Sequence, residues 1–180
     1  PRLTGVSRVL NCAAVTSFGR NPKTRITNVD ETVAFARTVA RLPRLERFVH
    51  VSTAMICGTH PPLIVREDAF PAKGVHHLVP YTESKAEAEW ILRKEMADVP
   101  FVVARPSIIV GHTRLGCTPS SSIFWAFRMG DALHVITSDV DGVIDVVPVD
   151  YASRAVQHLL FRSKLAHRTY HVSAGQNCSS

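Results

Sequence analysis

Tyr81 and Lys85 are the two residues whose types and spacing are suited to proton-transfer chemistry. They lie four positions apart within residues 80–87, PYTESKAE. The residues that follow, 86–96, are rich in Ala, Glu, Leu, Lys and Arg and contain no Gly or Pro, which predicts a helix. On a helix, side chains four positions apart share a face. A lysine ammonium beside a phenol favours the phenolate and lowers the pKa of the tyrosine, so the pair could exchange a proton with the oxygen of a carbonyl or an alcohol.

Taken alone, this spacing is a modest signal, because a solvated lysine and a tyrosine packed on the core at a helix start produce the same pattern. The elements that would position the pair come from the rest of the chain. Hydrophobic residues make up 46% of the 180 residues, which is enough for one domain with a sizeable core. No apolar run approaches the ~18 residues of a membrane span.

The net charge of +6 comes mostly from arginines that are scattered along the chain. Scattered charges predict a solvated surface, and without basic-aromatic interleaving they give no support to a nucleic-acid partner. Cys12, Cys57, Cys117 and Cys178 form no CxxC pair, so no metal site is expected. The simplest interpretation is a reduced intracellular compartment, the cytoplasm.

Strands and helices alternate along the chain. Strands are predicted over residues 6–14, 47–53 and 101–104, the last ended by Arg105-Pro106, and helices over residues 27–42 and 81–96, with a long irregular loop over residues 57–79. This alternation predicts an α/β fold with a parallel sheet covered by helices on both faces. Beyond Gly111 we expect a short helix over 123–129, a short strand over 144–147, a helix over 151–161 with Asp150 as its N-cap, and a final strand over 170–174.

Ligands of such sheets bind beyond the carboxyl ends of the strands. Four sets of candidate residues fall at this edge: Cys12-Ala13-Ala14, Ser52-Thr53, Tyr81 with Lys85, and Pro106-Ser107-Ile108. The predicted sheet therefore carries the Tyr81–Lys85 pair to the same edge as three other sets of small or polar residues.

Together these residues resemble an extended short-chain dehydrogenase/reductase, and within that superfamily the branch of fatty acyl-CoA reductases and thioester reductase domains, the male-sterility type of NAD-binding domain. The resemblance covers nearly the whole chain in the family's order. Its matching pieces are Ser52-Thr53-Ala54, Tyr81 with Ser84-Lys85 and Ala88-Glu89, Arg105 to Gly111, and Val147-Pro148-Val149-Asp150. It implies the C-terminal part of a Rossmann-type doubly wound parallel sheet, together with a small substrate-binding subdomain.

One departure concerns the family's glycine-rich loop, which holds the cofactor pyrophosphate at a helix N-terminus. No GxxGxxG occurs in this sequence, so the resemblance implies that this loop and the first three strands precede Pro1. The first strand here would correspond to the fourth of the full sheet. We therefore expect a partial NAD(P)-binding domain over residues 1–112 and a mainly substrate-binding part over residues 113–180, from which a helix and a strand return to the sheet.

The resemblance also implies a role for each candidate residue. Tyr81 would give its proton to the substrate oxygen as hydride arrives at carbon, Thr53 would hold that oxygen, and Lys85 would lower the pKa of Tyr81 and bind the nicotinamide ribose. The cofactor would be bound by Ala13, Ala14, Val51, Ser52, Tyr81, Lys85, Pro106, Ser107 and Ile108. The alternative for Thr53 is a strand-end hydroxyl that binds a loop amide, and Asn28 either braces the site or caps a helix.

These roles predict an NAD(P)H-dependent reductase that acts on an acyl thioester or a carbonyl compound, with NADP(H) favoured over NAD(H). A nucleotide-sugar epimerase or a sterol-type dehydrogenase on the same scaffold is the alternative, and a non-catalytic binding protein that kept the fold is the second. The apolar cluster Ile123, Phe124, Trp125 and Phe127 either walls an acyl pocket or belongs to the core. The expected partner is a small-molecule substrate, with no nucleic acid and no membrane span. A homodimer and a place in a larger multidomain chain are both left open.

Overall fold

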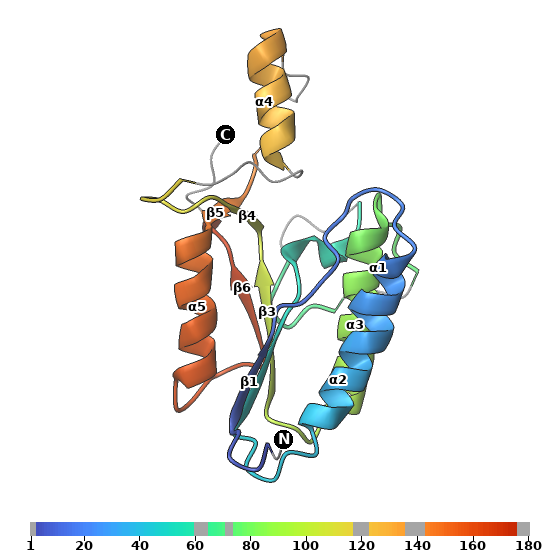
Figure 1. Ribbon diagram of the computed structural model, residues 1–180, viewed down its shortest axis with the longest axis vertical. Coiled ribbons are helices and arrows are strands. Elements are labelled where there is room, and N and C mark those ends of the chain that lie inside the picture. Colours follow the sequence, from blue (N-terminus) through green and yellow to red (C-terminus); the bar gives the residue numbers. More distant parts are fainter. Residues whose placement is uncertain (1–2, 60–64, 71–73, 117–122, 136–142, 176–180) are drawn as a thin grey trace.

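The computed structural model describes residues 3–59, 65–70, 74–116, 123–135 and 143–175, and its centre is a parallel sheet between two layers of helices (Figure 1). The sheet contains β1 (Arg8–Asn11), β2 (Arg47–Val51), β3 (Phe101–Pro106) and β6 (Thr169–Val172) in the order β1-β2-β3-β6, and each pairing is parallel. Helices α2 (Thr32–Val39) and α3 (Pro80–Glu95) cover one face, and α5 (Val149–Phe161) covers the other. The predicted α/β fold is confirmed.

Both faces of the sheet are buried because successive side chains of a strand point to opposite faces. Phe48 and Phe101 pack in the core beneath α2 and α3, whereas their neighbours Val49 and Val102 pack in the core beneath α5. All four side chains are buried. A strand whose side chains pack into a core on each face of the sheet has no polar face. For this reason these segments are almost continuously apolar in the sequence.

The helix predicted over residues 27–42 begins earlier than expected and is irregular. Its first turn, α1 (Lys23–Arg25), leads into a π-helical stretch, η1 (Ile26–Glu31), and only then into α2. Asn28 lies inside η1 and is fully buried, so it does not cap a helix start. Short π-helical stretches within α-helices are frequent at functional sites.

A second sheet of two parallel strands, β4 (Ile108–Val110) and β5 (Val146–Pro148), lies beyond the carboxyl ends of the main sheet (Figure 1). β5 overlaps the short strand predicted over 144–147, whereas β4 was not predicted. The helix α4 (Ile123–Leu133) projects from this end of the molecule, away from the main sheet. Among the helices that the structure describes, none is long and apolar enough to cross a membrane.

The prediction that Arg105-Pro106 ends the third strand was wrong, because β3 continues through both residues. The amide of Ser52 donates to Ala104 O, so Ala104 directs its carbonyl toward β2. Backbone groups alternate sides along a strand, so Pro106 faces the same side as Ala104, where β2 has already ended at Val51. The sheet therefore loses no hydrogen bond through the missing amide of Pro106.

The prediction that Asp150 caps the next helix was also wrong. The N-cap position of α5 is Pro148, which makes no side-chain cap, and Asp150 lies in the first turn. A carboxylate in this turn is favoured by the positive end of the helix dipole. Its two oxygens accept hydrogen bonds from Thr113 N and Thr113 Oγ1, at 3.1 and 3.0 Å. Asp150 thereby ties the segment after β4 to the start of α5.

Candidate active site

A pocket of ≈ 730 Å³ lies at the carboxyl ends of β1, β2 and β3, the edge at which the sequence predicts a site. It brings together most of the predicted site residues: Ala14, Val51, Ser52, Thr53, Tyr81, Lys85, Pro106, Ser107 and Ile108 all line it. Ala13 is not one of its lining residues, and the Ala13 amide instead donates to Asn11 Oδ1 at 3.1 Å.

The start of α3 positions Tyr81 and Lys85. Pro80 occupies the first turn, where its missing amide has no helical partner to lose. The Tyr81 ring is half-buried, and its centroid lies 6.3 Å from that of Phe18 in the loop after β1. One turn further, Lys85 is 2% exposed, and its Nζ donates to Val51 O at 2.7 Å. The lysine is therefore fixed against the end of β2.

The predicted effect of Lys85 on Tyr81 is absent from this structure, and that prediction was wrong. Burial raises the pKa of Tyr81 above its ordinary value, and Lys85 does not offset it. The spacing of four residues puts both side chains on one face of α3, but it does not direct Nζ, which binds Val51 O. Tyr81 is therefore a neutral phenol at pH 7, the form that can donate a proton.

Burial also changes the protonation of Lys85. It lowers the pKa of the lysine to about 8, because an ammonium loses hydration when it is buried. The negative charge of Glu89 opposes this effect without cancelling it. At pH 7 the ammonium still predominates, but its proton is held less tightly than that of an exposed lysine.

Ser52 and Thr53 follow β2 and line the pocket. The Ser52 amide extends the sheet by donating to Ala104 O at 2.7 Å, whereas Ser52 Oγ is buried and has no hydrogen-bond partner among the described residues. Thr53 caps the short 3₁₀-helix η2 (Ala54–Cys57), where its Oγ1 accepts from Met55 N at 3.3 Å. This is the loop-amide contact that the sequence left open for Thr53. It does not use the hydroxyl hydrogen, which Thr53 can still donate.

Asn28 braces the loop between β1 and α1. Its Oδ1 accepts from Val15 N at 2.7 Å, and its Nδ2 donates to Val15 O at 3.0 Å and to Ser84 Oγ at 2.9 Å. Ser84 directly precedes Lys85 on α3. Of the two interpretations of Asn28, the structure shows the bracing one, and the π-helical stretch is what turns this side chain inward.

Cys12, which the sequence places at this edge, also lines the pocket. Other lining residues were not singled out from the sequence, namely Thr16, Ser17, Phe18, Gly19, Met55 and Ile109. Most of them belong to the loop after β1, whose sequence has no periodicity and predicts only a loop. Its position directly after the first strand was the available signal, because that end of a parallel strand faces the ligand edge.

A buried ion pair of Glu89 and Arg105 joins α3 to the sheet. Arg105 Nη2 lies 2.6 Å from Glu89 Oε1, and both side chains are 0% exposed. Arg105 also donates to Ala69 O at 3.2 and 3.1 Å, and Arg93 Nε donates to Glu89 Oε1 at 3.0 Å. Glu89 and Arg105 both belong to the matching motifs, but no pattern in the sequence shows that they meet. The network joins α3, β3 and the segment 65–70.

The residues of this pocket fit the nicotinamide cofactor that the resemblance implies. Ser52 Oγ is a buried hydroxyl that lacks a partner among the residues the structure describes, and such groups in proteins are normally satisfied. The Lys85 ammonium has three donors, of which one is committed to Val51 O. With the Tyr81 hydroxyl, these groups offer hydrogen bonds to a ribose, and Ala14 and Ser107 leave room beside them.

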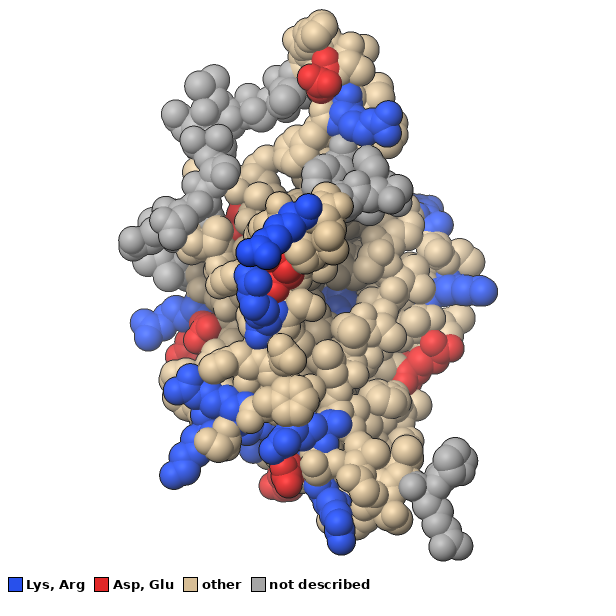
Figure 2. Space-filling view, turned by 60° about the vertical axis from the view of Figure 1, so that its left-hand side comes forward, with Lys and Arg blue, Asp and Glu red and all other residues tan. Residues whose placement is uncertain are grey.

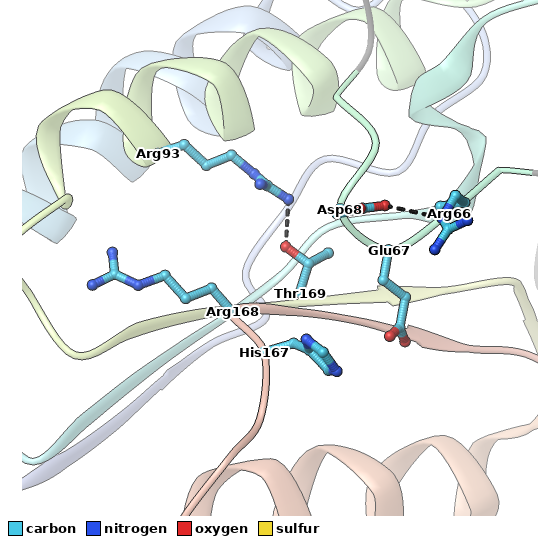
Figure 3. Close-up of a pocket in the computed structure, with 7 residues that line it drawn as sticks. All are labelled: Arg66, Glu67, Asp68, Arg93, His167, Arg168 and Thr169. Carbon is cyan, nitrogen blue, oxygen red and sulfur yellow. Dashed lines mark hydrogen bonds and ion pairs between the residues drawn. The ribbon is translucent and has the colours of Figure 1, made fainter.

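A second pocket, of ≈ 390 Å³, lies between α3 and β6 (Figure 3). Its charged residues are already engaged, since Arg93 donates to Thr169 Oγ1 and Arg66 pairs with Asp68 at 3.5 Å. Figure 3 shows that Arg93 and Arg168 point in different directions rather than toward one point. This pocket therefore offers no convergent charge to an anionic ligand.

Positive charge on the α5 face is spread out rather than gathered into one patch (Figure 2). Some of it is structural: Arg47 donates to Leu159 O and Arg162 O, both at 3.2 Å, at the end of α5. Arg8 lies over the ring of Phe161, 5.5 Å from its centroid. These arginines stabilise the packing of α5 on the sheet at the edge opposite the candidate site.

No group of three His, Cys, Asp or Glu side chains gathers as a metal site in the part of the chain that the structure describes. Cys12 and Cys57 are free thiols. Cys117 and Cys178 lie outside the described residues.

The sequence model of the male sterility protein family matches residues 2–156, and the chain therefore belongs to this family of NAD-binding domains. Its structure is similar to that of the terminal R domain from the myxalamid PKS-NRPS biosynthetic pathway, with 25% identity and a TM-score of 0.80 over 92% of this chain and 42% of that one. It is 26% identical over 109 residues to a linear gramicidin synthase of Brevibacillus parabrevis, a match that covers 60% of this chain and 2% of that protein.

Two further solved structures share the fold. UDP-glucuronic acid 4-epimerase from Bacillus cereus, in complex with UDP-glucuronic acid and NAD, is 18% identical with a TM-score of 0.74 over 95% of this chain and 55% of that one. RMD from Pseudomonas aeruginosa, complexed with NADPH, is 22% identical with a TM-score of 0.69 over 94% of this chain and 61% of that one. The chain thus has the fold of the extended short-chain reductases and epimerases, and it spans less than two thirds of each of these relatives.

Proposed function

We propose that this chain carries the active site of an NAD(P)H-dependent reductase that acts on an acyl thioester or another carbonyl compound. The observation that carries the proposal is that Thr53, Tyr81 and Lys85 line one pocket, next to the buried and unpartnered hydroxyl of Ser52. Membership of an NAD-binding family and the similarity to an R domain support it.

The three side chains divide the work of the reduction. When bound, a reduced nicotinamide supplies the hydride. Tyr81 is a neutral phenol at pH 7, a form that burial favours further by raising its pKa. Its phenolic proton is therefore present and would pass to the substrate oxygen as negative charge develops there. Thr53 donates its free hydroxyl hydrogen to the same oxygen. Lys85, mostly an ammonium at pH 7, would bind the ribose of the cofactor with the donors that Val51 O leaves free.

The residues that would hold the cofactor are those predicted from the sequence, with Ser52, Tyr81 and Lys85 binding the ribose through side chains. Ala14, Val51, Pro106, Ser107 and Ile108 would shape the pocket around it, and Ala13 would act through the loop that it shares with Ala14. We infer NADP(H) rather than NAD(H), acting in the cytoplasm. Residues 1–112 would supply most of the cofactor site, and residues 113–180 most of the substrate site.

We infer an acyl thioester rather than a sugar as the substrate because of the apolar surface of α4. Trp125 is 62% and Phe127 39% exposed, so neither belongs to the core, and the side chain of Phe124 lies outside the described residues. Neither Trp125 nor Phe127 lines the ≈ 730 Å³ pocket, so these two would contact an acyl chain beyond the reacting carbonyl. A sugar would need polar groups at that position, since an unsatisfied buried hydroxyl costs about 1–3 kcal/mol.

The test compares substrates on the full-length protein by following NADPH absorbance. Acyl-CoA and carrier-bound thioesters of increasing chain length are compared with UDP- and dTDP-sugars. If the chain is buried, kcat/KM should rise roughly fourfold for each added CH₂ that is buried, from about 0.8 kcal/mol per group. Turnover of a nucleotide sugar with no dependence on acyl length would replace the proposal with an epimerase. Cofactor binding without turnover of any substrate would indicate a non-catalytic protein.

A further inference from the structure

Asn11, His50 and Lys85 form a buried line of polar side chains behind the pocket. Asn11 and His50 are register partners across β1 and β2, and the three residues are 7%, 0% and 2% exposed. Asn11 Nδ2 lies 3.5 Å from His50 Nδ1, and Lys85 Nζ lies 3.5 Å from His50 Nε2. Each nitrogen of the imidazole therefore faces one neighbour.

The direction of the hydrogen bonds along this line can be deduced from the contacts of Asn11. The Ala13 amide donates to the Asn11 side chain at 3.1 Å, so the atom that faces Ala13 must be the amide oxygen. The amide nitrogen then faces His50 Nδ1, and because it can only donate, Nδ1 must be the ring nitrogen without a proton. A neutral imidazole with a bare Nδ1 carries its proton on Nε2, so an N–H faces Lys85 Nζ.

An N–H in this position distinguishes the two forms of the lysine. The neutral amine has a lone pair that accepts the hydrogen bond from His50 Nε2, whereas the ammonium has only donors and opposes it. Both forms can keep the bond to Val51 O. The arrangement of Asn11 and His50 therefore favours the neutral amine.

We propose that Asn11 and His50 are positioning residues that favour the neutral amine of Lys85 over its ammonium. Asn11 fixes the tautomer of His50, and His50 presents an N–H to Lys85 Nζ. Their effect adds to that of burial, and the negative charge of Glu89 acts in the opposite direction. His50 is neutral at pH 7, because burial and the neighbouring Lys85 hold its pKa well below the ordinary value. It can therefore discriminate between the two forms of the lysine without becoming charged.

The inference rests on the proposed function only for its catalytic consequence. If the ammonium of Lys85 is required, kcat/KM falls as the pH rises through the titration of Lys85, and the position of that fall depends on His50. The ring nitrogens of His50 and the Nζ of Lys85 can be observed without substrate. The tautomer proposal and the reductase proposal can therefore fail separately.

The test is Asn11→Leu in the full-length protein. Leucine resembles asparagine in shape and lies on the far side of the His50 ring from Lys85, so it acts on the lysine through His50. Isotope-edited nitrogen NMR reports the His50 tautomer, and the Cε shift of labelled lysine reports the titration midpoint of Lys85. We expect a proton on Nε2 in the wild-type protein, loss of that preference in the variant, and an upward shift of the Lys85 midpoint by about 1 pH unit.

His50→Phe provides the matched control, because a phenylalanine ring fills the site without ring nitrogens. In that background Asn11→Leu should leave the Lys85 midpoint unchanged. A proton on Nδ1 in the wild-type protein would overturn the proposal. A Lys85 midpoint that does not move in Asn11→Leu, or that moves equally in the His50→Phe background, would do the same. If a variant fails to fold, the tautomer in the wild-type protein still decides.

Discussion

Glu89→Gln tests how α3, the helix that carries Tyr81 and Lys85, is held in place. Glu89 accepts from Arg105 Nη2 at 2.6 Å and from Arg93 Nε at 3.0 Å, and the side chains of Glu89 and Arg105 are both 0% exposed. Glutamine keeps the shape and one acceptor oxygen but removes the charge. Arg105 would then remain buried as a guanidinium without a counterion, held by Ala69 O and by the one side-chain oxygen that glutamine keeps.

The expected cost is large because one charge of a buried pair is left uncompensated. Removing one partner of such a pair lowers the free energy of unfolding by about 3–5 kcal/mol. We expect the lower end of this range, because glutamine preserves packing and can still accept one hydrogen bond. Urea unfolding of the full-length protein, followed by circular dichroism, measures the change.

Glu95→Gln on the same helix is the matched control. Glu95 binds Arg37 at 2.6 Å, the same distance as in the buried pair, but the two side chains are 29% and 58% exposed. Water and salt screen this pair, so its removal should change stability little. Equal losses in the two variants would refute the argument that burial decides the effect. The double variant Glu89→Leu with Arg105→Met should recover most of the lost stability, because it leaves no buried charge unpaired between these two residues.

Two further predictions concern Lys85 and Asn28. Because burial lowers the pKa of Lys85 to about 8, the folded state binds fewer protons than the unfolded state between pH 8 and the ordinary value of 10.5. The wild-type protein should therefore gain up to about 3 kcal/mol of stability relative to Lys85→Met as the pH rises across this window, and urea unfolding that shows no such gain would contradict the assigned pKa. Asn28→Leu removes both hydrogen bonds to Val15 and the hydrogen bond to Ser84. The KM for NADPH should therefore rise about tenfold or more while kcat changes less. Steady-state kinetics in which kcat falls and KM does not rise would show that Asn28 does not act on cofactor binding through the loop between β1 and α1.

Much of the fold could be predicted because its signals are local. Residues 47–53 and 101–104 are short apolar runs, and the helix that follows residue 80 has a helix-forming composition. Because parallel strands end at one edge of a sheet, this order also places Ser52, Thr53, Tyr81 and Lys85 together. β4 could not be predicted, since it is three residues long and is defined only by its pairing with β5, far along the chain.

The chemistry within the site depended on contacts that no local pattern encodes. The spacing of Tyr81 and Lys85 indicates a shared helix face, but the direction of Nζ depends on Val51 O and His50 of β2. The pKa of Tyr81 rises because tertiary packing buries the ring, which reverses the effect expected from the pair alone. The bracing role of Asn28 likewise depends on a π-helical stretch that has no signature in the sequence.

The central claim is that Tyr81 donates the proton in a reduction carried out at this pocket. Tyr81→Phe keeps the ring against Phe18 and removes only the hydroxyl. In the full-length protein, single-turnover kinetics with NADPH and an acyl thioester should show hydride transfer slowed by about 10²–10⁴-fold, with the Kd for NADPH nearly unchanged. Hydride transfer at close to the wild-type rate in Tyr81→Phe would contradict the account.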